Sequence, residues 1–146
     1  MHNQCHCHAS SAYSQTQHEM DFDRSLHNAA QLNNIQRAKL LLKQINTYDH
    51  YGYLPIHYAC RQGHLEMCRL LIDHGACVDS ITRDSKVSCL HRACMGGHIK
   101  VVKLLLELGA NPIVSDREGR SVQDIISTLP NPEIKNELFG LLRSVT

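Results

Sequence analysis

The chain has 146 residues, a formal net charge of +1 and no tryptophan. This length accommodates one domain or a short array of repeats. The near-zero charge gives no bulk electrostatic reason to expect binding to nucleic acid or to an anionic membrane. The sequence has no run of about 20 apolar residues and no long apolar stretch at its start, so we expect neither a membrane span nor a signal peptide.

Residues 1–19 are polar and show no apolar period, so we expect a disordered N-terminal tail. This tail contains adjacent thiol and imidazole groups at Cys5, His6, Cys7 and His8. Such groups are good ligands for zinc or copper. Structural zinc sites usually place about two to four residues between paired ligands, however, and a second matched pair is missing. The spacing therefore favours incidental ligands, and metal binding by the tail is kept as an alternative.

Residues 20–48 have the pattern of a divergent first repeat. We expect a short inner helix containing Leu26, Ala29 and Ala30. The apolar residues expected on the following outer helix are Ile35, Ala38, Leu40, Leu41 and Leu42. A terminal repeat is expected to deviate from its neighbours because one of its faces has no repeat to pack against.

Residues 49–81 contain the clearest repeat. Pro55 opens an inner helix at a first-turn position, where its missing N–H costs nothing. Gly63 permits a tight turn between two antiparallel helices, and Gly75 ends the outer helix. The outer helix is predicted from an apolar stripe at helical spacing, formed by Met67, Cys68, Leu70, Leu71 and Ile72.

The same pattern returns 34 positions later in residues 82–115. The matching pairs are His57 and His91, Gly63 and Gly97, His64 and His98, Leu71 and Leu105, and Gly75 and Gly109. A fixed offset of this size indicates a stacked helical repeat. One residue is inserted around residues 82–86, and Lys86 stands where the turn glycine is expected. We therefore expect a longer or distorted hairpin at this place.

Residues 116–146 form a closing repeat. Gly119 restores the turn, Asp124 replaces the inner-helix histidine, and Pro130 limits the inner helix. The apolar residues of the predicted outer helix are Ile134, Leu138, Leu141 and Leu142. Polar residues surround them, as suits a cap with one face in water.

The phrases Leu-Pro-Ile-His-Tyr-Ala at 54–59 and Cys-Leu-His-Arg-Ala at 89–93, each followed by a Gly-His pair, resemble the ankyrin repeat family. The resemblance implies an all-α solenoid of about four helix-turn-helix repeats with hairpin fingers. The expected domain covers residues 20–146, with repeats at 20–48, 49–81, 82–115 and 116–146. The resemblance also implies that hairpin tips and inner helices line a concave groove, and that His57 and His91 hydrogen-bond turn backbone.

A thiol–imidazole pair formed by Cys60 and His57 would have the chemistry of a nucleophile and its base. The same pair recurs as Cys94 and His91 in a slot for small buried residues, which indicates packing rather than catalysis. We therefore expect no enzymatic activity and no cofactor. The seven cysteines are an odd number, and buried free thiols behave as small hydrophobes. This pattern favours a reducing compartment, the cytoplasm or the nucleus.

Surface positions that change from repeat to repeat are free to serve a partner. Three of the five tyrosines, Tyr51, Tyr53 and Tyr58, lie in one repeat, and tyrosine is common at interface hot spots. The arginines suit an acidic or carboxylate-bearing peptide. The residues predicted to contact a partner are His50, Tyr51, Tyr53, Tyr58, Arg61, Gln62, Ser85, Val87, Arg92, Met95, Arg117 and Arg120.

The sequence therefore favours a non-catalytic protein-interaction module or adaptor, because stacked repeats present an extended concave surface. It contains no metalloprotease helix, phosphate-binding loop, nucleophile elbow or dinucleotide glycine pattern. We expect a monomer that binds a protein partner, without a role for nucleic acid or membrane. The alternative is a metal-binding protein that uses the Cys/His tail. The fold resemblance does not identify the partner.

Overall fold

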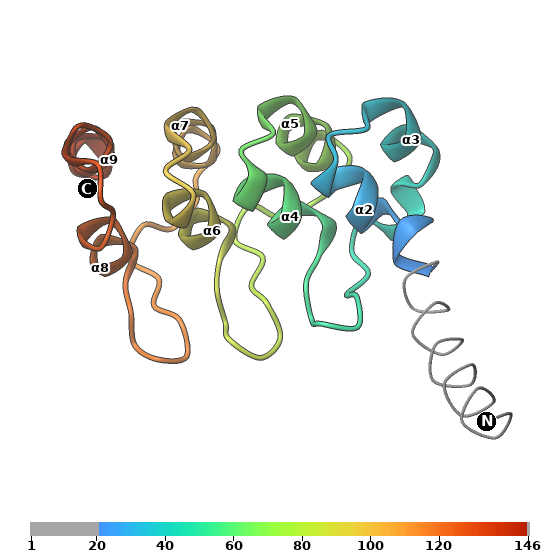
Figure 1. Cartoon of the computed structure of the whole chain (residues 1–146), viewed down its shortest axis with the longest axis horizontal. Coiled ribbons are helices and arrows are strands. Elements are labelled where there is room, and N and C mark those ends of the chain that lie inside the picture. The colour runs from blue at the N-terminus through green and yellow to red at the C-terminus, as the bar shows by residue number, and fades with distance from the viewer. Residues whose placement is uncertain (1–20, 146) are drawn as a thin grey trace, which may run out of the picture.

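The computed structural model describes residues 21–145. The expected tail at residues 1–19, with its candidate ligands Cys5, His6, Cys7 and His8, lies outside the described residues. From residue 26 onward, helix pairs stand side by side along the molecule (Figure 1). The helical elements are α2 (Leu26–Gln31), α3 (Ile35–Leu40), η1 (Leu42–Gln44), α4 (Pro55–Gln62), α5 (Leu65–Asp73), α6 (Cys89–Met95), α7 (Ile99–Glu107), α8 (Val122–Ser127) and α9 (Pro132–Val145).

The arrangement is the predicted all-α solenoid with hairpin fingers. The inner helices α2, α4, α6 and α8 form one row, the outer helices α3, α5, α7 and α9 form a second, and the fingers project from the inner row (Figure 1). Isolated antiparallel bridges join Ile81 to Ser88 and Ser115 to Ser121 at the bases of two fingers. In the described part of the chain, no helix has the length and apolar character that a bilayer span requires.

Local sequence explains where the helices start. Ser25, Ser88 and Ser121 precede inner helices, and each side chain accepts a hydrogen bond from a backbone N–H of the first turn. These caps satisfy N–H groups that have no partner within the helix. Pro55 begins α4 instead, at a position where no N–H is required. In each repeat, therefore, a capping serine or a proline sets the start of the inner helix.

The turns between paired helices need a left-handed backbone. Gly63 has a φ of 77° and Gly97 a φ of 68°, which glycine adopts without a Cβ penalty. Asn33 takes the corresponding place in the first pair with a φ of 56°. Asparagine is one of the few other residues that tolerate this conformation. Asn33 and Asn34 therefore replace the Gly-His pair, as the sequence predicts.

The core runs between the two rows of helices and continues from one pair to the next. Its largest fully buried apolar side chains are Leu26, Ile56, Met67, Leu71, Leu90, Leu105, Ile126, Leu138, Val101 and Val102. They come from every helix pair, so each repeat covers the apolar face of its neighbour. This continuity is what makes stacked repeats stable although no single repeat has a closed core.

The first outer helix is shorter than expected. α3 ends at Leu40 and a 3₁₀ turn, η1, follows. Leu40 lies on α3 as predicted but is 84% exposed, whereas Leu41 and Leu42, also predicted on this helix, fall after its end. Leu41 and Leu42 remain half-buried against the core.

The hairpin loops before α4, α6 and α8 are called here the first, second and third fingers, and the second is one residue longer than the other two. In the outer two fingers the closing N–H of residue i reaches the carbonyl of residue i+4, from Asp49 to Tyr53 and from Asp116 to Arg120. In the second finger the Thr82 N–H reaches the carbonyl of Val87 instead. Lys86 takes a φ of 55° in the turn. The predicted insertion and the replacement of the turn glycine are thus both present.

Candidate partner-binding surface

The repeated histidines of the inner helices hold the fingers to the helices. The His57 Nδ1 accepts the Leu54 N–H at 3.0 Å, and its Nε2 donates to the Ser80 carbonyl at 3.1 Å. His91 repeats this geometry with the Ser88 N–H and the Arg120 carbonyl. Both rings are buried and have partners on both nitrogens. Their role is therefore structural, as the resemblance implies.

A third histidine of this kind, His27, was not predicted from the sequence. His27 is buried in α2, and its Nε2 lies 2.8 Å from the Thr47 carbonyl and 3.1 Å from that of Tyr53. It precedes His57 by 30 positions rather than 34, because the first repeat is shorter. Alignment on Ala29 and Ala59, which follow the two histidines at the same distance, would have revealed it.

A second pair of histidines connects successive repeats. The His64 Nε2 lies 2.9 Å from the Gln31 carbonyl at the end of α2. The His98 Nε2 lies 2.8 Å from the Arg61 carbonyl at the end of α4. Carbonyls at helix C-termini lack partners within the helix, so each imidazole satisfies a group of the preceding repeat. This contact explains why histidine recurs after the turn glycine.

The buried histidines make the stability of the fold depend on pH. Burial lowers the pKa of His27 and of His91 below the ordinary value of 6.5. The unfolded chain therefore takes up protons first as the pH falls below 6.5, and acidification favours unfolding. We expect the free energy of unfolding, measured by urea denaturation, to fall between pH 7 and pH 5, by at most about 1.4 kcal/mol per pH unit for each histidine. A free energy that stays constant over this range would contradict the buried neutral state.

Cys60 and Cys94, the inner-helix cysteines that were weighed as nucleophiles, are buried thiols with a raised pKa. Cys60 and Cys94 are fully buried, and the Cys60 Sγ lies 3.7 Å from the Cys68 Sγ. Hydrogen bonding with Cys68 raises the pKa of Cys60, and burial raises that of Cys94 to about 12. Because the thiolate is the nucleophilic form, these thiols are unreactive. Among residues 21–145, no group of three or more His, Cys, Asp or Glu side chains is placed to hold a metal ion.

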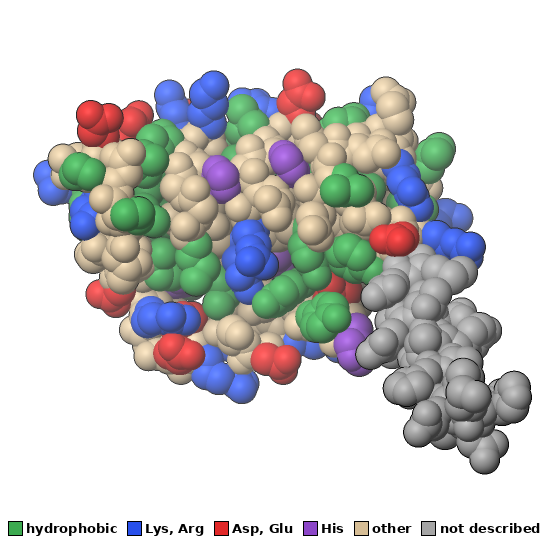
Figure 2. Space-filling model, viewed as in Figure 1, with side chains coloured by type: hydrophobic (Ala, Val, Ile, Leu, Met, Phe, Trp, Pro, Cys, Tyr) green, Lys and Arg blue, Asp and Glu red, His purple; other side chains and the backbone are tan. Residues whose placement is uncertain are grey.

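The side chains of the fingers and of the inner helices that lie outside the core are together called here the inner face. Most of the predicted contact residues lie exposed on it: His50, Tyr51, Arg61, Gln62, Ser85, Met95, Arg117 and Arg120. Tyr53, Tyr58 and Arg92 are half-buried. Figure 2 shows hydrophobic and basic side chains next to one another above the fingers.

The tyrosines form an ordered cluster at the first finger. The rings of Tyr53 and Tyr58 lie 5.6 Å apart, edge to face, and Phe22 lies 5.6 Å from Tyr58 on the other side. The Arg92 guanidinium lies 4.8 Å from the centre of the Tyr53 ring, within the range of a cation–π contact. The cluster thus joins two of the predicted tyrosines to Arg92 of the next repeat.

Asp49 organises this cluster, and the sequence analysis did not single it out. Its Oδ1 accepts the backbone N–H groups of Tyr51 and Tyr53, both at 2.9 Å. Its Oδ2 accepts a hydrogen bond from the Tyr58 hydroxyl. Burial raises the pKa of Tyr58, and the adjacent Asp49 carboxylate raises it further, so the phenol remains neutral. One carboxylate thus fixes both the turn and the ring of Tyr58.

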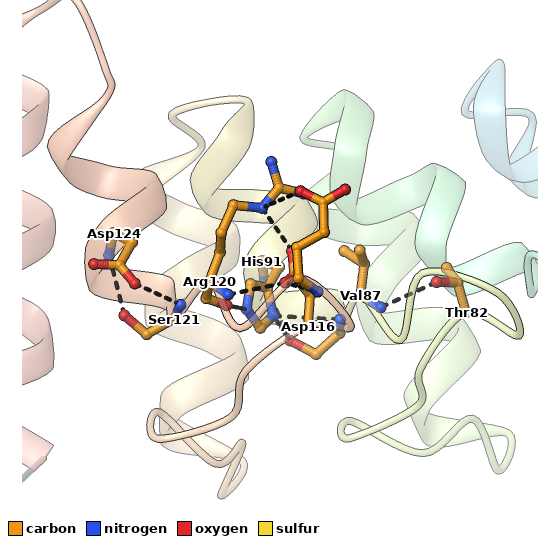
Figure 3. A network of polar contacts seen from close by, with 9 residues as sticks. Thr82, Val87, His91, Asp116, Arg120, Ser121 and Asp124 are labelled. Carbon is orange, nitrogen blue, oxygen red and sulfur yellow. Dashed lines mark hydrogen bonds and ion pairs between the residues drawn. The ribbon is translucent and has the colours of Figure 1, made fainter.

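One predicted contact residue is wrong. Val87 is only 3% exposed and does not lie at the tip of its finger. Its N–H donates to the Thr82 Oγ1 at 3.0 Å, so it closes the base of the finger (Figure 3). The inserted residue moves the tip to positions 83–86, and the apolar side chain is buried beneath it. Val87 is therefore removed from the candidate surface.

Arg120 has partners within its own finger (Figure 3). Its Nε donates to the Asp116 Oδ2 at 2.9 Å and lies 3.4 Å from a Glu118 carboxylate oxygen. Desolvation raises the pKa of Asp116, but hydrogen bonds and the charge of Arg120 outweigh it and lower the pKa below its usual value. The guanidinium is already compensated, so Arg61, Arg92 and Arg117 are the better candidates to meet a partner's carboxylate.

A pocket of about 920 Å³ opens beside the tyrosine cluster at the N-terminal end of the inner face. Only three of its lining residues, His50, Tyr51 and Tyr58, are among the contacts predicted from the sequence. The full lining is Asp21, Phe22, Asp23, Ser25, His27, Gln31, Gln44, Thr47, Tyr48, Asp49, His50, Tyr51 and Tyr58. These residues come from segments up to 37 positions apart in the sequence, so no local motif predicts the pocket.

About half of the chain is similar in sequence to known ankyrin repeat proteins. Ankyrin repeat domain-containing protein 39 of Homo sapiens is 38% identical over 71 residues, which are 47% of this chain and 39% of that protein. Ankyrin repeat domain-containing protein 49 of Bos taurus is 38% identical over 68 residues, 44% of this chain and 29% of that protein. A putative ankyrin repeat protein of fowlpox virus, FPV244, is 32% identical over 76 residues, 50% of this chain and 11% of that protein. The matched segments thus span well under half of each relative.

The sequence pattern of the family described as Ankyrin repeats (3 copies) matches residues 26–116, which contain α2 to α7 and the first two fingers. The match covers more than half of the chain. It includes the buried histidines, the turn glycines and the inter-repeat histidine contacts described above. The chain therefore belongs to the ankyrin repeat family.

Proposed function

We propose that this chain is a non-catalytic interaction module that binds a segment of a protein partner along its inner face. Ankyrin repeats are in general protein-interaction modules. The observation that carries the proposal is the exposure of Tyr51 on the first finger, Arg61 on α4 and Met95 on α6. Tyr51 is 68% exposed and Met95 40% exposed, although both are large apolar side chains. None of the three is required by the packing of the repeats.

The charge of the inner helices supports a partner with carboxylate groups. α2, α4 and α6 contain no Asp or Glu, whereas Arg61 and Arg92 lie on α4 and α6. Arginine binds a carboxylate through two parallel hydrogen bonds, which adds geometric specificity to charge attraction. Arg92 is held over Tyr53, so part of its conformational freedom is lost before binding. We infer that an acidic residue of the partner lies over these two arginines.

The proposal is tested by affinity capture from a cell lysate. The bait is the full chain, either unchanged or with Tyr51→Ala, Arg61→Ala and Met95→Ala combined. A matched control carries Glu66→Ala, Arg69→Ala and Lys103→Ala, three exposed positions of the outer helices. Circular dichroism checks that all three baits are folded. We expect a specific protein that the inner-face variant loses and the outer-helix variant keeps.

The opposite pattern, with the partner lost only by the outer-helix variant, would overturn the inner-face assignment. A partner retained by both variants would do the same. Failure of the unchanged chain to retain any protein specifically would count against an interaction module.

We also propose that the chain acts as a monomer in a reducing compartment, the cytoplasm or the nucleus. The five cysteines at positions 60, 68, 77, 89 and 94 are all free thiols, and four of them are buried. Buried free thiols of this kind act as small apolar side chains and need no oxidising environment.

A further inference from the structure

The pocket at the N-terminal end of the inner face combines two chemical features. Four aromatic side chains line it, from Phe22, Tyr48, Tyr51 and Tyr58. Three carboxylates line it as well, from Asp21, Asp23 and Asp49. Its thirteen lining residues include no lysine and no arginine. Aromatic faces and carboxylates both attract cations, so the two features select for the same kind of group.

The pocket has the volume of a binding site, and hydrogen bonds and ring contacts fix several of its lining side chains. Its volume of about 920 Å³ lies within the range of roughly 300–1,000 Å³ that is usual for ligand sites, and it exceeds the size of a single side chain. The Asp49 carboxylate is fixed by two backbone N–H groups and the Tyr58 hydroxyl. Phe22 and Tyr58 hold one another edge to face. A ligand would therefore meet a wall that is already arranged.

From this geometry we propose that the pocket binds a cationic side chain, lysine or arginine, of the partner protein. The inference rests on the proposed function, because it assigns one end of the same inner face. The aromatic rings contact the alkyl stem and face the charge, while the three carboxylates neutralise it. The stem of a lysine or arginine packs well on apolar surface while its charged head stays near polar groups.

The pocket also makes the two ends of the inner face differ in charge, which sets the orientation of a bound partner segment. Its N-terminal end is acidic and aromatic, whereas α4 and α6 present Arg61 and Arg92 without any acidic residue. A partner segment with a basic residue followed at some distance by an acidic one fits this surface in one orientation. The reverse orientation would place like charges together, which is unfavourable.

The test uses the full chain and small probes of defined charge. N-acetyl-lysine methylamide and N-acetyl-arginine methylamide are the cationic probes, and N-acetyl-norleucine methylamide is the neutral probe of similar length. N-acetyl-glutamate methylamide is the anionic probe. NMR spectra of the aromatic side chains report binding at Phe22, Tyr51 and Tyr58. We expect concentration-dependent shifts of these signals with the cationic probes alone, and weaker binding at 1 M salt than at 0.1 M because salt screens the charges.

Charge-removing variants then test whether the carboxylates, rather than the shape of the pocket, bind the cationic probes. Asp21→Asn combined with Asp23→Asn removes two charges and leaves the finger bonds of Asp49 in place. We expect the cationic probes to bind about fivefold more weakly for each charge removed. Asp84→Asn, an exposed carboxylate of the second finger outside the pocket, is the control and should leave probe binding unchanged.

Equal shifts with the norleucine probe would overturn the proposal, since the pocket would then select apolar groups. The absence of shifts with either cationic probe, or unchanged binding to the Asp21→Asn, Asp23→Asn variant, would also overturn it. These results are distinct from a failure of the proposed function. The chain would still lose its partner when Tyr51, Arg61 and Met95 are replaced, if the inner face binds without a basic residue.

Discussion

Replacement of Leu105 by alanine is expected to lower the free energy of unfolding by about 2–5 kcal/mol. Leu105 is fully buried in α7, and this helix packs against α6 of its own repeat and against α5 and α9 of the flanking repeats. Truncation removes apolar contacts and leaves a cavity that neighbouring helices cannot readily close. The loss affects three repeats because the core is continuous.

The matched control is Leu108→Ala, three positions later on the same helix end. Leu108 is 47% exposed, so its truncation should change the free energy of unfolding by about 0.5 kcal/mol or less. Urea denaturation followed by circular dichroism measures both variants. If Leu105→Ala fell in the range of the surface control, the placement of α7 in the core would be wrong.

Gly63→Ala is expected to destabilise the fold by about 2–4 kcal/mol, for two separate reasons. The backbone of Gly63 has a φ of 77°, a conformation that alanine disfavours. In addition, a Cβ at this position would lie only 2.4 Å from the His98 Nδ1. The ring cannot move aside without losing its hydrogen bond to the Arg61 carbonyl. The substitution therefore disrupts the contact between two repeats.

Gly119→Ala separates the two effects. Its φ of 78° matches that of Gly63, but an added Cβ would meet no atom within 4 Å. We expect only the backbone cost of about 1–2 kcal/mol for this variant, measured by urea denaturation. Gly63→Ala should cost more, and adding His98→Ala should recover part of the difference, because the clash is then absent. Equal costs at Gly63 and Gly119 would show that the ring contact does not constrain position 63.

The fold follows from the sequence because its signals are local and repeated. The 34-residue offset from His57 to His91, the turn glycines and the apolar stripes each specify an element within a few residues. The first repeat was less predictable, since its shorter length hides His27 and its outer helix α3 ends before Leu41 and Leu42. Deviations in length break the offset on which repeat detection depends.

The candidate surface was only partly predictable. Tyr51 and Arg61 are exposed and Tyr53 and Tyr58 half-buried, and their use as partner contacts stays a prediction. Val87 is buried, since an inserted residue shifts the phase of its finger. The pocket was missed because it joins Phe22 and Asp23 to Asp49 across a turn of the solenoid. Such a juxtaposition depends on tertiary packing, and the spacing of residues along the sequence does not predict it.

The most direct test of the central claim is amide hydrogen exchange on the complex with a captured partner. We predict slower exchange in the fingers and inner helices, residues 49–62 and 83–95, compared with the free chain. The outer helices α5 and α7 should exchange at unchanged rates. Protection confined to α5 and α7, with the fingers unchanged, would contradict the assignment of the inner face as the binding surface.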